Sequence, residues 1–379
     1  MSQDWTGYTQ ANDDQRSDIE LLKSEVGQRF PFYDMKYDRN MLAFFCRIDE
    51  ERLEENFDSL RLSLSEKGYI PMLRYTKGEH ILYIIRKQKR KFKPVWVNVA
   101  LLIATIITTT LAGSIQWVGI SNGDILEIIS ANYLWNGLLY FSIPLLLILG
   151  IHEMGHYFAS KKHKVDSSLP YFIPLPPPFI LGTFGALIAT REPIPDRKAL
   201  IDIGAAGPIC GFLVAIPVSI LGFYFMQQNP IYPVTDAGGF VLIYPLFLQW
   251  LGSLFPMPQN IVIHPTAFAG WVGLFITALN LLPIGQLDGG HVIRALFKEN
   301  SKYITWIVMI SLIAWGFYVS ATTNYAGWLV FIMFIMFMIG TRHPAPLNEI
   351  SPIDNKRKII GIVALIIFIL CFAPIPISS

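Results

Sequence analysis

Five consecutive residues, His152-Glu153-Met154-Gly155-His156, carry the clearest chemical signal in the chain. Histidines at positions i and i+4 of a helix share one face, so both imidazoles can reach a single Zn²⁺ ion. Glu153 then lies on the adjoining face, where its carboxylate can accept a proton from an attacking water molecule. The pattern predicts a zinc-dependent hydrolytic site. The alternative interpretation is a polar cluster that caps the cytoplasmic end of a membrane helix.

A catalytic zinc site usually has three protein ligands, so two histidines leave one ligand to be found. Asp288 is the candidate, because it follows another apolar segment and stands at the same expected membrane side as the histidines. Pro283 and Gly285 can turn the chain so that Asp288 returns toward them. Asp288 can instead cap a short helix that starts at Gly289, and capping does not exclude metal ligation.

Two polar residues near Asp288 are further candidates. Asn280 lies in an apolar stretch, where its side-chain amide either hydrogen-bonds a neighbouring helix or donates to the oxyanion formed when water attacks a peptide carbonyl. His291 is expected to hydrogen-bond near the site or at the membrane interface. We predict no role for His163, His264 and His343, which lie at segment edges.

These residues belong to a chain with the composition of a membrane protein. Hydrophobic residues make up 53% of the 379 residues and charged residues only 15%, against about a quarter charged in soluble globular proteins. Apolar segments long enough to span a bilayer recur after Lys93. They are 95–117, 134–160, 199–226, 266–284, 303–320, 325–340 and 358–375. The sequence predicts a polytopic α-helical membrane protein with about seven spans.

Positive charge sets the expected orientation in a cell membrane. If the amino terminus is cytoplasmic and the segments alternate, every Lys and Arg after Lys93 falls on a cytoplasmic flank. The outer loops 118–133, 227–265 and 321–324 contain none. Gly238 to Phe255 is apolar and nearly long enough to span, but a span there would invert every later segment. We therefore expect it to be re-entrant or interfacial.

A proline-rich loop interrupts the membrane part after the second segment. Prolines at 170, 174, 176, 177 and 178 exclude a regular helix over Leu169 to Ile180, and a β-prone run from Phe184 to Thr190 follows. We expect a re-entrant β-hairpin that enters the membrane from the cytoplasmic side, where protein or water covers its backbone. Its residues Gly182, Phe184 and Gly185 are candidates for substrate binding by strand addition.

The sequence of residues 1–93 predicts a soluble cytoplasmic α+β domain, which precedes a membrane-embedded part, 94–379. Two segments have helical spacing and two are rich in strand-forming residues. They are Ser17–Phe30 and Glu50–Lys67 for the helices, and Phe32–Ile48 and Tyr69–Ile85 for the strands. The domain ends in a basic cluster between Arg86 and Lys93, which is typical of a cytoplasmic membrane flank.

Composition also restricts partners and processing. The formal net charge of +2 gives no support for a nucleic-acid partner, so the lipid bilayer is the expected environment. The first 28 residues lack a basic start followed by an apolar core, and we expect no cleavable signal peptide. Cys46, Cys210 and Cys371 are far apart, without the spacing of a disulfide framework or a metal site, and are expected to be reduced.

Two motifs together give a resemblance. His152 to His156, followed by Asn280-x-x-Pro283-x-x-x-Leu287-Asp288-Gly289, resembles the site-2 protease family of intramembrane zinc metalloproteases. The resemblance covers roughly residues 134 to 300, taken as the catalytic core, and Gly182–Gly185, Glu192–Arg197 and Gly204–Gly211 are similar to its longer prokaryotic and chloroplast-type branch. It implies His152, His156 and Asp288 on zinc, Glu153 as the base, and a membrane hairpin that presents the substrate. Unlike relatives with a PDZ domain, this chain has none recognisable between the motifs.

The sequence thus predicts a zinc endopeptidase that cuts membrane proteins within or beside a transmembrane helix. One alternative is a transporter whose His, Glu and Asp residues form an ion path. A transporter predicts internal repeats, and the chain has no pair of matching halves. The other alternative is a catalytically inactive membrane scaffold, against which the intact Glu153 argues.

Overall fold

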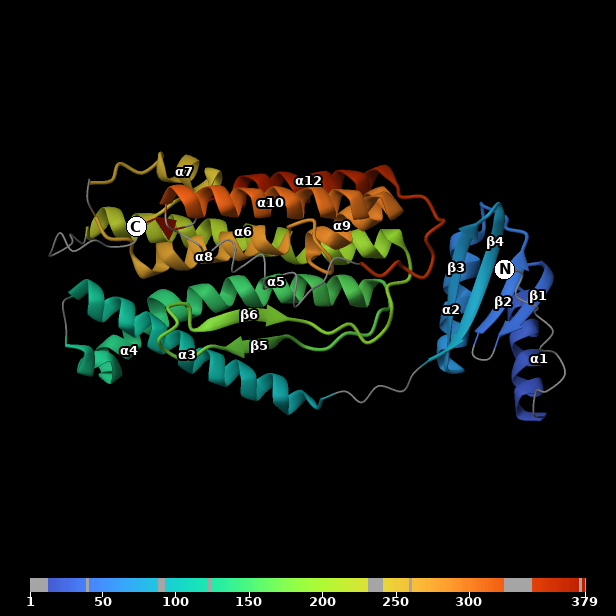
Figure 1. The fold of residues 1–379 in the computed structure, drawn as a ribbon. Coiled ribbons are helices and arrows are strands. Elements are labelled where there is room, and N and C mark those ends of the chain that lie inside the picture. The colour runs from blue at the N-terminus through green and yellow to red at the C-terminus, as the bar shows by residue number, and fades with distance from the viewer. Residues whose placement is uncertain are drawn as a thin grey trace. The chain divides into compact units, whose positions relative to one another are not determined.

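The computed structural model describes residues 13–38, 41–87, 93–121, 124–230, 241–258, 261–323, 343–374 and 377–378. The chain forms two compact units, coloured along the sequence in Figure 1. Unit 1 combines Met1–Phe92 with two later segments, Pro193–Leu200 and Ala345–Asp354. Unit 2 contains Lys93–Glu192, Ile201–Pro344 and Asn355–Ser379.

Unit 1 is built on a four-stranded antiparallel sheet. Its strands are β1 (Phe32–Asp38), β2 (Met41–Cys46), β3 (Tyr69–Thr76) and β4 (Glu79–Arg86), in the order β1-β2-β4-β3. The strands predicted from the two aromatic-rich stretches are confirmed as two hairpins. Lys77 and Gly78 turn the second hairpin with φ angles of 55° and 87°, as a tight two-residue turn requires.

Two helices pack on the sheet of unit 1, α1 (Asp13–Gly27) and α2 (Leu53–Glu66). Because side chains alternate along a strand, Leu42 and Phe44 of β2 point to one face and join Leu22 and Leu60 of the helices in a common core.

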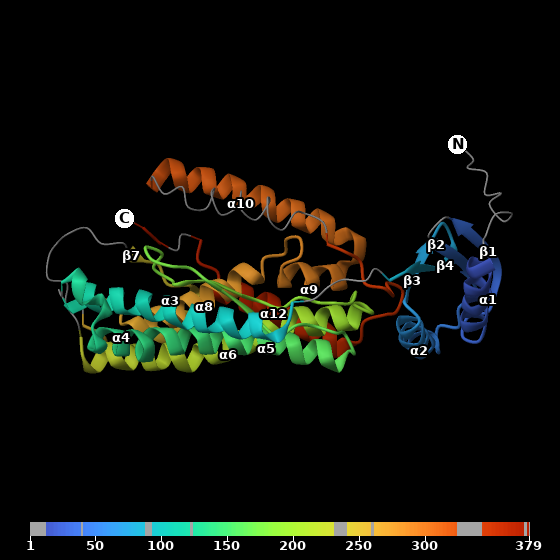
Figure 2. The same ribbon diagram turned by 90° about the horizontal axis from the view of Figure 1, so that it is seen from below.

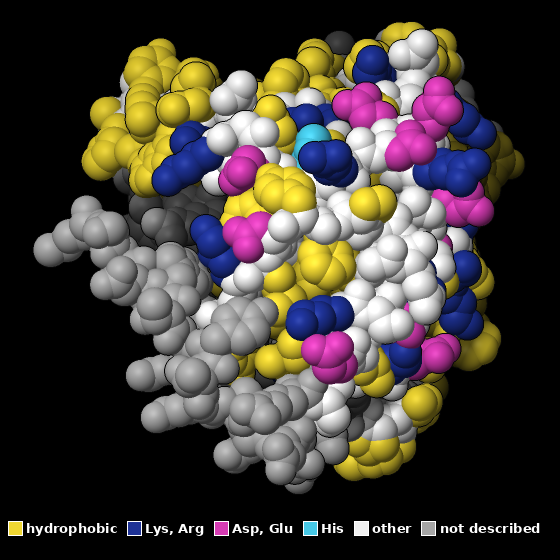
Figure 3. All heavy atoms as spheres, turned by 90° about the vertical axis from the view of Figure 1, so that its right-hand side faces the viewer, with side chains coloured by type: hydrophobic (Ala, Val, Ile, Leu, Met, Phe, Trp, Pro, Cys, Tyr) yellow, Lys and Arg dark blue, Asp and Glu magenta, His cyan; other side chains and the backbone are white. Residues whose placement is uncertain are grey.

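Figure 3 shows a face on which Lys and Arg side chains mix with Asp and Glu. Interspersed charges of both signs are expected where a surface meets water.

The two later segments complete unit 1. The Leu73 amide of β3 donates to the Leu347 carbonyl at 2.8 Å, and the Leu347 side chain lies buried in the core. The Asn348 amide donates to the Pro195 carbonyl at 2.7 Å, so the two segments also bond to each other. Lys198 pairs with Glu54 of α2 at 2.5 Å. Unit 1 therefore gathers chain from three separate parts of the sequence.

Unit 2 is helical, and its long helices run along one common direction in Figures 1 and 2. Its larger helices are α3 (Val95–Ser121), α5 (Ile143–Lys162), α6 (Arg197–Gln228, of which the part from Ile201 belongs to unit 2), α8 (Pro265–Asn280), α9 (Asp288–Phe297), α10 (Ser301–Thr323) and α12 (Asn355–Cys371). Shorter elements are η1 (Ile125–Ile129), α4 (Ala131–Gly137), η2 (Leu138–Ser142), α7 (Leu246–Gly252) and η3 (Lys298–Asn300).

Helix α8 is the centre of unit 2, because every residue from Pro265 to Leu274 is buried. Its side chains share a core with Leu145 and Ile148 of α5. By contrast, α3 exposes apolar side chains at every fourth position along Val99, Ile103 and Ile107. A stripe of this kind faces lipid in a membrane protein, while the polar groups turn inward.

Four helical stretches of the described residues are long and apolar enough to cross a membrane: Val95–Gly119, Ala131–Lys162, Arg197–Gln228 and Asp288–Thr322. The chain therefore has the build of a helical membrane protein. Two more predicted segments overlap shorter helices. Segment 266–284 overlaps α8, which is 16 residues long, and segment 358–375 overlaps α12, which is 17 residues long. The predicted segment 325–340 lies outside the described residues.

The proline-rich loop and the run after it form a two-stranded sheet of β5 (Tyr171–Pro174) and β6 (Thr183–Leu187). The strands are antiparallel, with Tyr171 opposite Leu187 and Phe172 opposite Ala186. Thr108 of α3 donates its hydroxyl to the Gly182 carbonyl at 2.7 Å, which ties the hairpin to that helix. A Cβ on Gly182 would lie 2.6 Å from the α3 backbone, so this close approach requires glycine.

The apolar stretch Gly238 to Phe255 contains two short elements in its described part. These are β7 (Val241–Leu242) and the seven-residue helix α7. A helix of seven residues is about 10 Å long, far less than the roughly 30 Å of a bilayer core. β7 pairs with β8 (Ile377–Ser378) at the carboxy-terminal end of the chain.

Candidate metal centre

The two motif histidines lie on one face of α5, one turn apart, as helical spacing predicts. Their Nε2 atoms are 3.2 Å apart, and both side chains are buried. Helix α5 is apolar before His152 and carries Lys161 and Lys162 in its last turn. Cations near a helix C-terminus interact favourably with the helix dipole, so these two lysines stabilise the C-terminal end of α5.

Asp288 reaches the same place from a different part of the chain. Its Oδ2 atom lies 3.3 Å from Nε2 of His152 and 3.2 Å from Nε2 of His156. The residue at the N-cap position of α9 is Leu287, and this cap has no side-chain hydrogen bond. The Asp288 carboxylate therefore faces the histidines.

Glycines close the turn that returns the chain from α8 to Asp288. Gly285 has a φ of +50°, in the left-handed region that glycine adopts without strain. A Cβ on Gly289 would lie 2.0 Å from the Leu281 carbonyl oxygen, which leaves no space for a side chain. The paired glycines after Asp288 thus allow a turn tight enough to bring its carboxylate to the histidines of α5.

The three side chains fit a zinc ion in spacing and in chemistry. His152, His156 and Asp288 form the one group of three or more potential ligands among the described residues, with their ligand atoms within 4.8 Å of one another. Donors about 2.0–2.1 Å from a tetrahedral zinc ion stand about 3.3 Å from each other. The observed separations of 3.2 to 3.3 Å match that value. Two imidazoles and one carboxylate are also a ligand set found in catalytic zinc sites.

Helix α6 holds His156 from the other side. The Nδ1 atom of His156 lies 2.7 Å from the Ile203 carbonyl oxygen, so Nδ1 carries the proton and donates. Nε2 is then left as the acceptor that faces Asp288 and His152. This arrangement is the usual one for a metal-binding histidine, whose second nitrogen fixes the tautomer and the ring orientation.

Glycines in α6 make room for the two imidazoles. A Cβ on Gly207 would lie 2.1 Å from Nε2 of His156, and one on Gly211 would lie 2.9 Å from Nδ1 of His152. Sequence reasoning found neither these contacts nor the Ile203 carbonyl. The available signal was the spacing of Gly204, Gly207 and Gly211, which places small residues along one side of α6.

Glu153 and Asn280 also lie at this centre. The Glu153 side chain is buried, and the backbone amide of Ile188, just after β6, faces its carboxylate. Nδ2 of Asn280 is 3.3 Å from Nε2 of His152, so the end of α8 contacts the same imidazole. The structure therefore brings together all five residues singled out for catalysis or metal binding.

His291, His264 and the hairpin residues each have contacts of their own. Nδ1 of His291 is 3.0 Å from the Leu287 carbonyl, and its ring meets the His343 ring edge to face, with centroids 4.4 Å apart. His264 caps α8 by accepting from the Thr266 amide. In the hairpin, Phe184 is 58% exposed, whereas Gly185 is buried with a φ of +102° and Gly182 packs on α3.

Comparison with known proteins finds matches in the family that the motifs resemble. The model of peptidase family M50 matches residues 140–315, which include both motifs. A probable zinc metalloprotease, EGY1 of Arabidopsis thaliana chloroplasts, is 30% identical over 247 residues, or 60% of this chain and 41% of that protein. The probable zinc metalloprotease EGY2 of the same plant is 28% identical over 235 residues, or 61% of this chain and 40% of that protein. The chain thus spans about two fifths of the length of these relatives. No solved structure matches the chain.

Proposed function

We propose that this chain, whose residues 140–315 match the model of peptidase family M50, is a member of the site-2 protease family and an intramembrane zinc metalloendopeptidase that cuts transmembrane segments of membrane proteins. The observation that carries the proposal is the buried group of His152, His156 and Asp288, with Glu153 beside it on α5. Three ionisable residues of an apolar helix bundle converge on one point. Ionisable groups are costly in such a place and are retained for function.

The residues have separate tasks in peptide hydrolysis. His152, His156 and Asp288 would hold a zinc ion, which would supply Lewis-acid activation of the scissile carbonyl and of water. Glu153 accepts the proton of the attacking water and then passes it to the leaving amine. Glu153 therefore acts first as general base and then as general acid. The Asn280 amide, at the His152 ring, donates to the carbonyl oxygen as negative charge develops on it.

The β5–β6 hairpin is proposed to hold the substrate beside this site. A helical substrate keeps its carbonyls in i to i+4 hydrogen bonds, so cleavage requires local unwinding. A strand edge replaces the broken hydrogen bonds with new ones and keeps the peptide extended. The position of the Ile188 amide next to the Glu153 carboxylate supports this, because a peptide alongside β6 would pass the base.

The proposed topology has about seven spans, with the amino terminus, unit 1 and the hairpin entrance on the cytoplasmic side of a cell membrane. Residues 1–93 are proposed as a soluble domain and 94–379 as the membrane-embedded part. The pairing of β7 with β8 supports an outer carboxy terminus, because β7 lies in the predicted outer loop 227–265. The short α7 supports a segment Gly238 to Phe255 that does not span.

Purified protein in detergent tests the proposed activity. We expect one zinc per chain and cleavage of a model substrate that contains a single transmembrane helix. Removal of zinc with a chelator should abolish cleavage, and added zinc should restore it. Cleavage that persists at full rate in the metal-free protein would contradict a zinc peptidase.

A further inference from the structure

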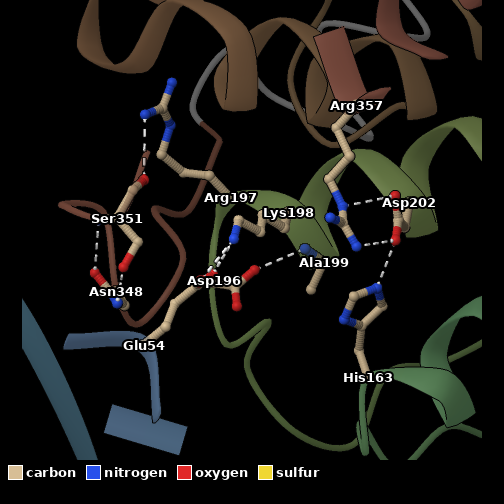
Figure 4. A network of polar contacts seen from close by, with 10 residues as sticks. All are labelled: Glu54, His163, Asp196, Arg197, Lys198, Ala199, Asp202, Asn348, Ser351 and Arg357. Carbon is tan, nitrogen blue, oxygen red and sulfur yellow. Dashed lines mark hydrogen bonds and ion pairs between the residues drawn. The ribbon is translucent and has the colours of Figure 1, made fainter. Parts of the chain in front are cut away.

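A second polar cluster in unit 2 lies apart from the proposed ligands and has Asp202 of α6 at its centre (Figure 4). Arg357 of α12 donates to both Asp202 carboxylate oxygens, from Nε at 3.1 Å and from Nη2 at 2.9 Å. Nε2 of His163, at the C-cap of α5, is 2.8 Å from Oδ2 of the same carboxylate. One side chain thus binds groups from two other helices.

The side chains of this cluster are largely buried, so their interactions can hold the ends of the helices in place. The side chains of Asp202, His163 and Arg357 are 10%, 14% and 18% exposed, respectively. A bidentate pair of Arg with a carboxylate is a strong and directional interaction, and partial burial limits screening by salt. Lys162 also lies 3.7 Å from Oδ2, but it is 71% exposed, so it contributes little.

The chain connects this cluster to the proposed metal ligand His156. Ile203, whose carbonyl accepts the Nδ1 proton of His156, is the residue next to Asp202. On α5, His163 follows His156 by seven residues, which places both on one helix face about two turns apart. Two adjacent residues of α6 therefore hold the same face of α5 at two points.

The directions of the side chains fit this arrangement. A side chain leans toward the N-terminus of its helix, so the Asp202 carboxylate extends toward the beginning of α6, where it meets the end of the antiparallel α5. The Ile203 carbonyl points the opposite way along α6, toward His156. Rotation or sliding of α6 against α5 would disturb both contacts together.

We propose that Asp202 is a positioning residue of the metal centre, which sets the register of α6 against α5 and so aims the Ile203 carbonyl at His156. The inference rests on the proposed zinc function. Its consequence is that loss of the Asp202 interactions leaves all three ligands in place but weakens the orientation of one of them. Removing interactions that orient a ligand typically lowers metal affinity about 10-fold to 100-fold.

The test compares zinc affinity in full-length protein in detergent, measured by competition with a chelator, for wild type and Asp202→Asn. Asn has nearly the shape of Asp but cannot form the charged bidentate pair. We expect zinc affinity to fall about 10-fold to 100-fold. In metal-free protein, ¹⁵N NMR of His156 should show loss of the single Nδ1–H tautomer. Zinc affinity equal to wild type would overturn the proposal.

Two controls separate positioning from general stability. Asp166→Asn removes another carboxylate near an arginine, one that is 57% exposed, and should leave zinc affinity unchanged. Ala364→Gly loosens α12 at a fully buried residue and should lower the thermal midpoint without changing zinc affinity. Equal affinity losses in Ala364→Gly and Asp202→Asn would also overturn the proposal.

A milder variant keeps the test decisive if Asp202→Asn does not fold. Arg357→Lys retains the charge but replaces the two directional bonds with one, since Lys cannot bind a carboxylate in the bidentate way of Arg. We expect a smaller affinity loss than in Asp202→Asn, of no more than about 10-fold. Wild-type affinity in this variant would contradict positioning by Asp202. A wild-type protein that bound no zinc would instead contradict the proposed function itself.

Discussion

The two nitrogens of the His156 ring face different partners, and that division depends on the surroundings of the ring. Nδ1 faces the Ile203 carbonyl, and Nε2 faces Asp288. Gly207 is the residue of α6 that permits this, because a Cβ there would lie 2.1 Å from Nε2. A methyl group at that point would occupy space that a metal ligand atom needs.

Gly207→Ala should therefore lower zinc affinity by at least about 10-fold. Intrinsic helix propensity favours Ala over Gly by about 1 kcal/mol, so an affinity loss would be due to the contact and not to a weaker helix. Gly119→Ala in α3 is the matched control, because its Cβ would meet nothing within 4 Å. Zinc titration of both variants checks the prediction, and equal affinities would argue against contact between Gly207 and the site.

Asp288 is the proposed anionic ligand, and its removal should have a larger effect. Asp288→Ala should lower zinc affinity by more than the roughly 100-fold that loss of an orienting interaction causes. Asp166→Ala, at an exposed carboxylate outside the site, should bind zinc as wild type does. Unchanged zinc content in folded Asp288→Ala would mean that its carboxylate is not a zinc ligand.

The site residues predicted from the sequence depend on local spacing, whereas those that the sequence did not reveal depend on contacts between helices. His152 and His156 share one helix face, so their spacing alone predicts that they meet, and it places Glu153 on the adjoining face. Asp288 required one further step, the turn after α8, which Pro283 and Gly285 indicate. The Ile203 carbonyl carries no side-chain signal, and His163 is recognisable only once α5 and α6 are packed together. Contacts between helices depend on rotation and register, which a single sequence does not specify.

At the scale of elements, the β5–β6 hairpin is proposed to hold the substrate beside the site. Amides two residues apart on a strand point to the same edge. Because the Ile188 amide faces Glu153, the Ala186 amide points to that edge also, away from β5. The prolines of this loop excluded a helix, but the pairing of Phe172 with Ala186 became visible only in the structure.

Ala186→Pro removes one donor from this edge, and the loss should fall mainly on substrates that resist unwinding. One backbone hydrogen bond is worth about 0.5–1.5 kcal/mol, so kcat/KM on a stable helical substrate should fall roughly 2-fold to 10-fold. A substrate already weakened by Gly or Pro near the cut should lose less. Ala186→Val, which keeps the donor, is the control. Equal losses on both substrates, or no loss, would contradict strand addition.

At the scale of the whole molecule, the proposed orientation is based on the distribution of charge, and the β7–β8 pairing agrees with it. A cysteine at Ser378 should therefore react with a membrane-impermeant reagent only from the outer side. A cysteine at the exposed Thr76 of unit 1 is the control and should react only from the cytoplasmic side. Cytoplasmic labelling at Ser378 would mean that Gly238 to Phe255 spans, or that one of the last three predicted segments does not.

Sequence patterns predicted the strands of unit 1 and the helical membrane part, because both depend on local periodicity. They did not predict that Pro193–Leu200 and Ala345–Asp354 belong to unit 1. Both segments are short, and Leu347 is buried only because β3 offers an edge to which its backbone can bond. Such long-range pairing leaves no periodic trace in the sequence.

The measurement that most directly tests the central claim is turnover by Glu153→Gln. The amide can hydrogen-bond a water molecule but cannot accept its proton, whereas the proposed ligands His152, His156 and Asp288 are unchanged. Zinc content and cleavage of a single-span model substrate are measured on the same purified sample. We predict one zinc per chain, as in wild type, and no detectable turnover. Cleavage near the wild-type rate by the zinc-loaded variant would contradict the assignment of Glu153 as the base and, with it, the proposed mechanism.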